Sequence, residues 1–198
     1  MEFPEGDISF ADRIVSLNPS SEGSAPYNDS TRALGPPDGD YLSIGNATTT
    51  CNSQVVFEFG DNYLIDTDGD DLWIFETGPA VEATDLYISQ KGSDWISVGK
   101  IEGSTRGVDI SSFVSPGQRF PFVRLCDFAD GATSGGSTPG PDIDAVGAIG
   151  SVFRPENERE TLPDDGQQGG GQQGTRPFPA ATSRRRRSGA AIRQTSRG

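Results

Sequence analysis

Short apolar runs separated by Gly, Pro, Asp and Ser fill the first three quarters of the chain. Apolar and polar residues alternate in several runs, which is the period of a strand with one buried face. Leu72–Phe75 is continuously apolar and predicts a strand buried on both faces. We predict strands at Ile8–Leu17, Tyr41–Ile44, Val55–Phe59, Leu72–Phe75, Asp85–Ser89, Trp95–Ile101, Val108–Ile110, Phe113–Val114, Phe120–Cys126 and Asp142–Ile149. About eight to ten short, evenly spaced strands favour an all-β fold, a jelly-roll-like antiparallel β-sandwich.

The composition changes after Arg154. Residues 155–198 contain the Gly-Gln repeat Gly166–Gly174 and the run Arg184–Arg187, with few large apolar side chains. Such a segment buries too little surface to offset the entropy lost on ordering. We therefore predict a calcium-assisted sandwich domain over residues 1–153 and a disordered Gly/Gln/Arg-rich linker or tail over residues 154–198, dispensable for folding.

Charge narrows the range of partners. Residues 1–150 carry 7 basic and 24 acidic side chains, a net charge of −17. A field of that sign repels nucleic acid and attracts cations, so we expect no nucleic-acid partner. The chain has no His, which excludes a Ser-His-Asp triad and a His-ligated zinc site. It has no apolar stretch long enough for a transmembrane segment, and no export signal is recognisable at its start.

Four carboxylates crowd the turn that precedes the Leu72–Phe75 run, and they belong to Asp66, Asp68, Asp70 and Asp71. So many like charges repel one another unless water screens them or a cation neutralises them. Hard oxygen ligands of this kind suit Ca²⁺. The turn half-matches an EF-hand loop, but Asp71 stands where the loop requires Gly and Thr77 where it requires Glu. The sequence therefore predicts a calcium site that is not an EF-hand.

A second acidic pair, Asp142 and Asp144, lies on a predicted strand. Side chains at i and i+2 of a strand point to the same face, so both carboxylates should aim at one spot. They could serve as a catalytic pair for glycoside hydrolysis, bind a structural Ca²⁺, or simply be solvated at a strand end. We expect them to converge with Asp71 and the Pro37–Asp38 turn on one cation site. The predicted metal ligands are Asp38, Asp66, Asp68, Asp70, Asp71, Asp142 and Asp144.

The chain has two cysteines, Cys51 and Cys126. Each lies next to a predicted strand, so they are candidates for a disulfide if the domain is exported, and for two buried thiols otherwise. The large aromatic residues are predicted to be core rather than a sugar-stacking platform, and Trp95, just after a loop, is the best candidate for exposure.

Several segments occur in an order that resembles a bacterial extracellular β-sandwich domain. That domain occurs in secreted proteins with PEP-CTERM-type sorting tails and ahead of OmpA-like domains in cell-envelope proteins. The matching segments are Phe10–Ser16, Ala33–Asp38, Asp71–Gly78, Val81–Glu82, Ile88–Ser89, Trp95–Gly99, Phe122–Leu125 and Asp142–Ala148. The resemblance implies an exported surface domain of jelly-roll type, stabilised by a cation and without established enzymatic activity.

Two hypotheses about function follow. The first is a non-catalytic, calcium-binding module, secreted or on the cell surface, with glycans or cell-envelope components as candidate partners. The alternative is a carbohydrate-active enzyme, or its carbohydrate-binding accessory domain, that uses Asp142 and Asp144.

Overall fold

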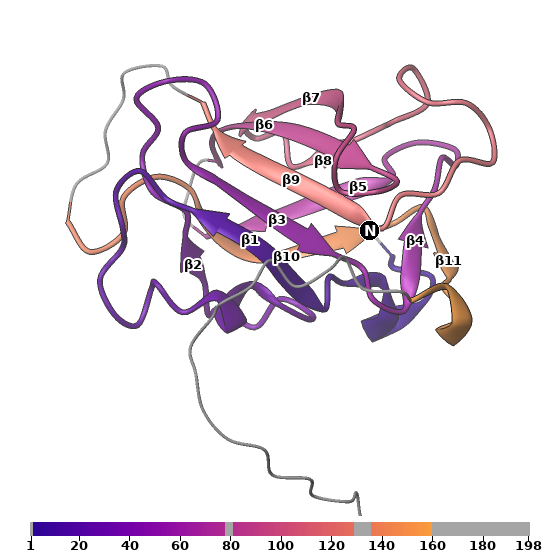
Figure 1. Ribbon diagram of the computed structural model, residues 1–198, viewed down its shortest axis with the longest axis horizontal. Coiled ribbons are helices and arrows are strands. Elements are labelled where there is room, and N and C mark those ends of the chain that lie inside the picture. The colour runs from indigo at the N-terminus through magenta and orange to yellow at the C-terminus, as the bar shows by residue number, and fades with distance from the viewer. Residues whose placement is uncertain (1, 78–80, 129–135, 160–198) are drawn as a thin grey trace, which may run out of the picture. The chain divides into compact units, whose positions relative to one another are not determined.

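The computed structural model describes residues 2–77, 81–128 and 136–159, and it consists mainly of β-strands (Figure 1). The strands of this part of the chain are β1 Arg13–Asn18, β2 Leu42–Ser43, β3 Gln54–Glu58, β4 Asn62–Leu64, β5 Leu72–Glu76, β6 Val81–Ser89, β7 Ile96–Gly103, β8 Gly107–Val108, β9 Phe122–Asp127, β10 Asp142–Ala148 and β11 Ser151–Phe153. Its helical turns are the short 3₁₀ segments η1 Gly6–Ser9, η2 Ser30–Ala33 and η3 Glu156–Glu158. None of the described helices is long and apolar enough to cross a membrane.

The strands form two large antiparallel sheets and one small one. The larger has the order β1-β3-β9-β6-β7, and the second has the order β2-β10-β5-β8. Figure 1 shows β1, β3 and β9 in front of β5 and β10. Strands β11 and β4 pair separately. The predicted all-β sandwich is therefore confirmed.

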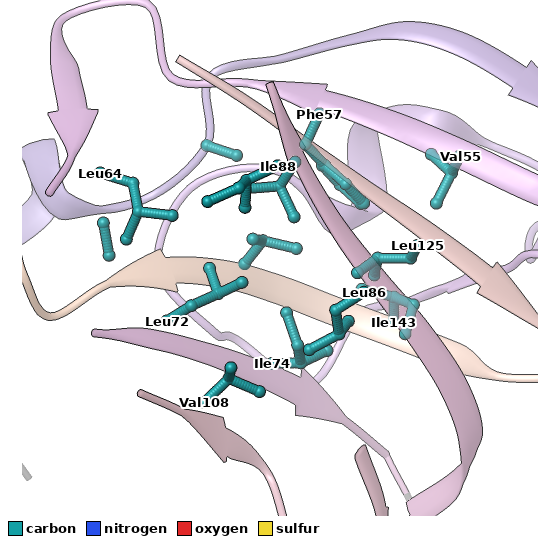
Figure 2. Packing of buried hydrophobic residues seen from close by; sticks show 14 of the residues in the cluster. Val55, Phe57, Leu64, Leu72, Ile74, Leu86, Ile88, Val108, Leu125 and Ile143 are labelled. Atoms are coloured by element: carbon teal, nitrogen blue, oxygen red, sulfur yellow. The ribbon is translucent and has the colours of Figure 1, made fainter. Parts of the chain in front are cut away.

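The core lies between the two large sheets. Phe57, Ile88 and Leu125 enter it from the five-stranded sheet and Ile74 and Ile143 from the other, and all five are 0% exposed (Figure 2). Ile88 and Leu125 belong to strands whose apolar positions alternate or nearly do, so the sequence pattern already marks their face, whereas Ile74 belongs to the continuously apolar run Leu72–Phe75. Burying one such side chain contributes about 1.5–3 kcal/mol.

The prediction that Leu72–Phe75 is buried on both faces is wrong. Leu72 and Ile74 are fully buried, but Trp73 and Phe75 are only partly buried. Only one face of β5 meets the core. The ring of Phe75 is covered from outside by Phe10, at 6.0 Å between centroids, and by another ring of the N-terminal segment. An apolar run can therefore arise because a distant segment covers its second face.

Other local predictions also need correction. Phe113–Val114 forms no strand, because it lies in turns after β8. The first strand begins at Arg13, and the residues before it form η1 and a connecting segment. Strands β4 and β11 were not predicted.

Two links hold the ends of the sandwich. Cys51 precedes β3 and forms a disulfide with Cys126 of β9, with their Cα atoms 4.8 Å apart. Arg154 follows β11, is 4% exposed, and donates to Glu58 Oε1 at 3.0 Å and to the Phe59 carbonyl at 2.9 Å. Arg154, the first residue after the predicted domain limit at residue 153, therefore packs against the sandwich. The predicted disordered tail, residues 154–198, begins with the described residues 154–159, which include η3, and its remainder, residues 160–198, lies outside the described residues.

Candidate metal centre

Asp71 connects three parts of the sandwich through its backbone. Its N–H donates to the Val108 carbonyl at 2.9 Å, next to the pairing of β5 with β8. Its carbonyl accepts from the N–H groups of Ile149, at 2.6 Å, and Gly150, at 3.1 Å, where β10 turns into β11. The residue is 0% exposed. These bonds fix where its side chain points.

The Asp71 carboxylate is buried but well supplied with donors. Oδ1 accepts from the N–H and the hydroxyl of Thr67, both at 2.7 Å, and Oδ2 accepts from the Ile110 N–H at 3.0 Å. Burial raises the pKa of Asp71, and the negative charge of Asp66 raises it further, while these hydrogen bonds oppose the rise.

Asp66 and Asp109 complete a cluster around Asp71. Each of the three residues offers one carboxylate oxygen, and these oxygens all lie within 4.8 Å of one another. The antiparallel pairing of Leu72 with Val108 explains the approach, because Asp71 precedes one partner and Asp109 follows the other. Asp109 is exposed, and the hydrogen bond from Ser111 lowers its pKa. The cluster thus joins a turn, a buried hub and a surface loop.

One oxygen of this cluster lacks a hydrogen-bond partner among the described residues. This atom, Asp66 Oδ1, is shielded from solvent. A buried carboxylate oxygen without a donor costs free energy unless something positive reaches it. Two more oxygens lie close to the backbone of Gly150. A Cβ added to Gly150 would lie 2.6 Å from Asp71 Oδ1 and 3.0 Å from Thr67 Oγ1. Hard oxygens from carboxylates and a hydroxyl are the donor set that Ca²⁺ prefers, so the residues fit this ion.

The other acidic residues of the turn do not join the cluster. Asp68 is exposed, and the side chain of Asp70 lies against Gly107. Gly69 between them has φ +93°, a left-handed conformation that glycine adopts readily. Of the four carboxylates predicted in this turn, the structure brings together Asp66 and Asp71.

The predicted convergence of Asp71 with Asp142 is wrong. In the β5–β10 pairing, Leu72 faces Ala148 whereas Glu76 faces Ile143. Asp71 and Asp142 therefore lie at opposite ends of this strand pair, roughly 20 Å apart at about 3.3 Å per residue, because Asp142 lies opposite Thr77, six residues beyond Asp71.

Asp142 and Asp144 also take different partners. Asp144 accepts from the backbone N–H groups of Asp38 and Gly39, both at 3.1 Å, and its pKa is raised by burial. Asp38 contributes its amide here, while its own carboxylate accepts from the Asp40 N–H at 2.9 Å. The β10 register shifts between Ile143 and Ala145, so simple i, i+2 geometry does not apply at Asp144.

Asp142 lies instead near two glutamates. Burial raises its pKa to about 6, with a further contribution from Glu82. Glu76 is 7% exposed, and burial raises its pKa to about 7, although the Glu82 N–H donates to both of its carboxylate oxygens, at 3.1 and 2.9 Å. Asp142 Oδ1 is buried, and within the described part of the chain it has no hydrogen-bond partner. This end of β5 therefore holds acids that ionise reluctantly.

Sequence reasoning missed Asp109 and Glu76. Asp109 is a lone acid between two apolar residues of the segment Val108–Ile110, and that interruption was its only signal. Glu76 ends the apolar run of β5, where a polar residue reads as the first residue of a loop. Only the strand pairing reveals what each one faces.

A scan against protein-family models finds no match, and neither does a search of curated proteins. Among solved structures, a family 89 glycoside hydrolase from Clostridium perfringens in complex with PUGNAc is similar, with a TM-score of 0.44 and 14% identity over 72% of this chain. The matched part spans 14% of that hydrolase chain. The C-terminal domain of a chitobiase from Bacteroides fragilis is similar over 76% of this chain and 98% of its own, with a TM-score of 0.44 and 12% identity.

Proposed function

We propose that this protein is a non-catalytic β-sandwich module in which Asp66, Asp71 and Asp109 hold one Ca²⁺. The observation that carries the proposal is the approach of three carboxylate oxygens to within 4.8 Å of one another. One of the three residues, Asp66, also has a buried oxygen that no described residue contacts by a hydrogen bond. A divalent cation between them would neutralise the repulsion among these carboxylates.

The ion would act as a structural clamp. It would tie the turn before β5 to the loop after β8, and through Asp71 to the Ile149–Gly150 turn. Calcium is favoured over softer metals because the chain has no His and its two cysteines are joined in a disulfide. Calcium is favoured over Mg²⁺ because it tolerates irregular coordination.

An exported setting fits this chemistry. A site with an exposed ligand such as Asp109 suits the weak affinities, about 10⁻⁴–10⁻³ M, of extracellular calcium modules. Disulfides form and persist in oxidising compartments, so the Cys51–Cys126 bond supports the same location. We propose that the protein is secreted or lies on the cell surface, and the sequence resemblance to cell-envelope domains supports this location.

The alternative, catalysis by Asp142 and Asp144, has lost its main support. A glycosidase pair must flank one bond, whereas Asp144 is engaged by the Asp38 and Gly39 amides and Asp142 lies among glutamates. We therefore propose a binding or structural role.

Thermal melting tests the calcium proposal. With about 20 mM Ca²⁺ and the affinity range above, binding to the folded state adds about 2–3 kcal/mol, which should raise Tm by roughly 4–10 °C relative to EDTA. Asp66→Asn and Asp109→Asn should abolish this increase. Asp68→Asn, in the same turn but outside the cluster, should retain it. In EDTA, Asp66→Asn should melt no lower than the wild type, because it removes a repulsive charge from Asp71. A wild-type Tm that ignores calcium would refute the proposal.

A further inference from the structure

A cavity of about 410 Å³ opens beside the end of β6, with a lining of residues other than Asp66, Asp71 and Asp109. Its lining includes three basic residues, Lys91, Arg119 and Arg154, and one acidic residue, Glu158. The sequence around it is strongly acidic, with a net charge of −17 over residues 1–150. Basic residues on the lining of a cavity in such an acidic chain would attract an anionic ligand.

The three cations are not equally engaged. Arg154 is saturated by Glu58 and by the carbonyls of Phe59 and Glu158. Arg119 is half-exposed, and its Nη1 lies 4.0 Å from Glu158 Oε2. Lys91 is exposed, and its ammonium makes no ion pair within the part of the chain that the structure describes. Lys91 and Arg119 are thus able to bind an incoming anion.

The cavity already accommodates a carboxylate. Glu158 Oε2 accepts from the Tyr63 hydroxyl at 3.1 Å and faces Arg119. The Glu158 side chain is 44% exposed, so it occupies the rim and does not fill the space. The Tyr63 hydroxyl and Arg119 therefore already bind one carboxylate at this position, and the cavity has room for a larger acidic group.

A further cation lies on the same sheet face. Phe122 lines the cavity, and Arg124 is two residues further along β9, so both side chains leave the same face. The Arg124 guanidinium lies between the rings of Tyr87, at 4.3 Å, and Trp95, at 4.6 Å. Its Nε is buried, and none of the residues that the structure describes forms a hydrogen bond with it. The basic surface thus continues beyond the cavity.

We propose that this cavity binds an acidic sugar, with Lys91 and Arg119 holding the carboxylate of a hexuronate ring. Gln90 and the Tyr63 hydroxyl oxygen, which can accept while the hydroxyl donates to Glu158, supply hydrogen bonds for ring hydroxyls, and the side chains of Pro121 and Phe122 supply apolar surface. A sugar acid matches this mixture of charge, polar groups and apolar wall. An acidic peptide side chain would use the cations alone and leave most of the volume unfilled. This site is independent of the proposed calcium site.

The test is a titration of the full-length protein with glucuronate in EDTA, followed by amide chemical shifts. We expect shifts centred on Lys91, Arg119 and Tyr63, and none with neutral glucose. Lys91→Gln and Arg119→Gln should each weaken binding at least about tenfold, because each removes a charge-assisted hydrogen bond. Lys100→Gln, which removes a charge on β7 outside the cavity lining, should leave binding unchanged, as should Asp66→Asn. Glu158→Gln should strengthen binding, because it removes the resident carboxylate.

Four results would overturn the proposal. They are no shifts with glucuronate up to about 50 mM, well above a millimolar Kd; equal shifts with glucose; equal weakening in Lys100→Gln; and tighter binding of a poly-glutamate peptide at the same residues. The last would identify the surface as a site for acidic peptides. Because calcium is absent from the titration and Asp66→Asn is included, failure here is separate from failure of the calcium site.

Discussion

At the scale of single residues, the buried acids at the two ends of β5 have different surroundings. Asp71 is surrounded by donors from Thr67 and Ile110 and belongs to the carboxylate cluster. Glu76, at the other end, accepts from the backbone N–H of Glu82 and lies near other acids. The first arrangement suits a cation, whereas the second suits a proton.

We predict that Glu76→Gln makes the protein less sensitive to pH. The pKa of Glu76 is raised from 4.5 to about 7, so the folded state binds the proton more tightly than the unfolded chain. The resulting stability is fully present below pH 4.5 and is lost as the pH rises through about 7. At 1.36 kcal/mol per pKa unit the loss is at most about 3 kcal/mol. Asp142, with its pKa raised to about 6, contributes in the same direction.

Urea unfolding at pH 5 and pH 8 measures this effect. Glu76→Gln should be close to the wild type at pH 5 and more stable at pH 8, because Gln never ionises. Glu22→Gln, at an exposed position, is the control and should leave the pH dependence unchanged. An equal effect of Glu76→Gln at both pH values would contradict the assignment.

At the scale of elements, Arg154 fastens the segment after β11 to β3. Its side chain and that of Glu58 are 5% and 4% exposed, so the pair is fully buried. We predict that Arg154→Met costs about 3–5 kcal/mol, because Glu58 then keeps a buried charge with one partner fewer. Arg13→Met removes the other, half-exposed partner of Glu58 and should cost about 1 kcal/mol or less. Equal losses in urea unfolding would show that the buried pair has no special role.

The same pair sets the limit for truncation. A chain that ends after Arg159 should melt within a few degrees of the full-length protein, and one that ends after Phe153 should lose the stability of the Arg154–Glu58 pair. The tail over residues 154–198 is predicted to be dispensable for folding, and the chain that ends after Arg159 tests that prediction for residues 160–198.

The disulfide joins Cys51, in the segment before β3, to Cys126 of β9. Strands β3 and β9 also pair directly, with Gln54 opposite Cys126. The bond closes a loop with a sequence separation of 75 residues, which in the chain-entropy model is worth about 4 kcal/mol. Replacing Cys51 and Cys126 by Ser together should therefore lower the unfolding free energy by an amount of that order. A double variant as stable as the oxidised wild type would contradict this expectation, and so would two free thiols in the wild type on alkylation under non-reducing conditions.

At the scale of the whole molecule, the sequence predicts the fold better than the sites. Strands of clear period, such as Val55–Phe59 and Phe120–Cys126, appear close to their predicted positions. Strands β4 and β11 have three residues each, too few to show a period. The continuous apolar character of Leu72–Phe75 arises because the N-terminal segment covers one face, which no local pattern reveals.

The candidate site shows the same limit. The acidic turn was visible in the sequence, and two of its carboxylates, those of Asp66 and Asp71, belong to the cluster. Asp109 enters through the β5–β8 pairing, which joins residues far apart in the chain. Asp142 is excluded by the β5–β10 register, which places it at the opposite strand end. Spacing along the chain identifies which residues can bind a cation, and strand register decides which of them meet.

The central claim, a Ca²⁺ held by Asp66, Asp71 and Asp109, is tested most directly by anomalous diffraction from crystals grown with about 20 mM CaCl₂, a concentration well above the expected Kd. The account predicts one anomalous peak among these three carboxylates, with Asp66 Oδ1 as a ligand at 2.3–2.6 Å. Crystals that show no peak there, with Asp66 Oδ1 still without a partner, would contradict it.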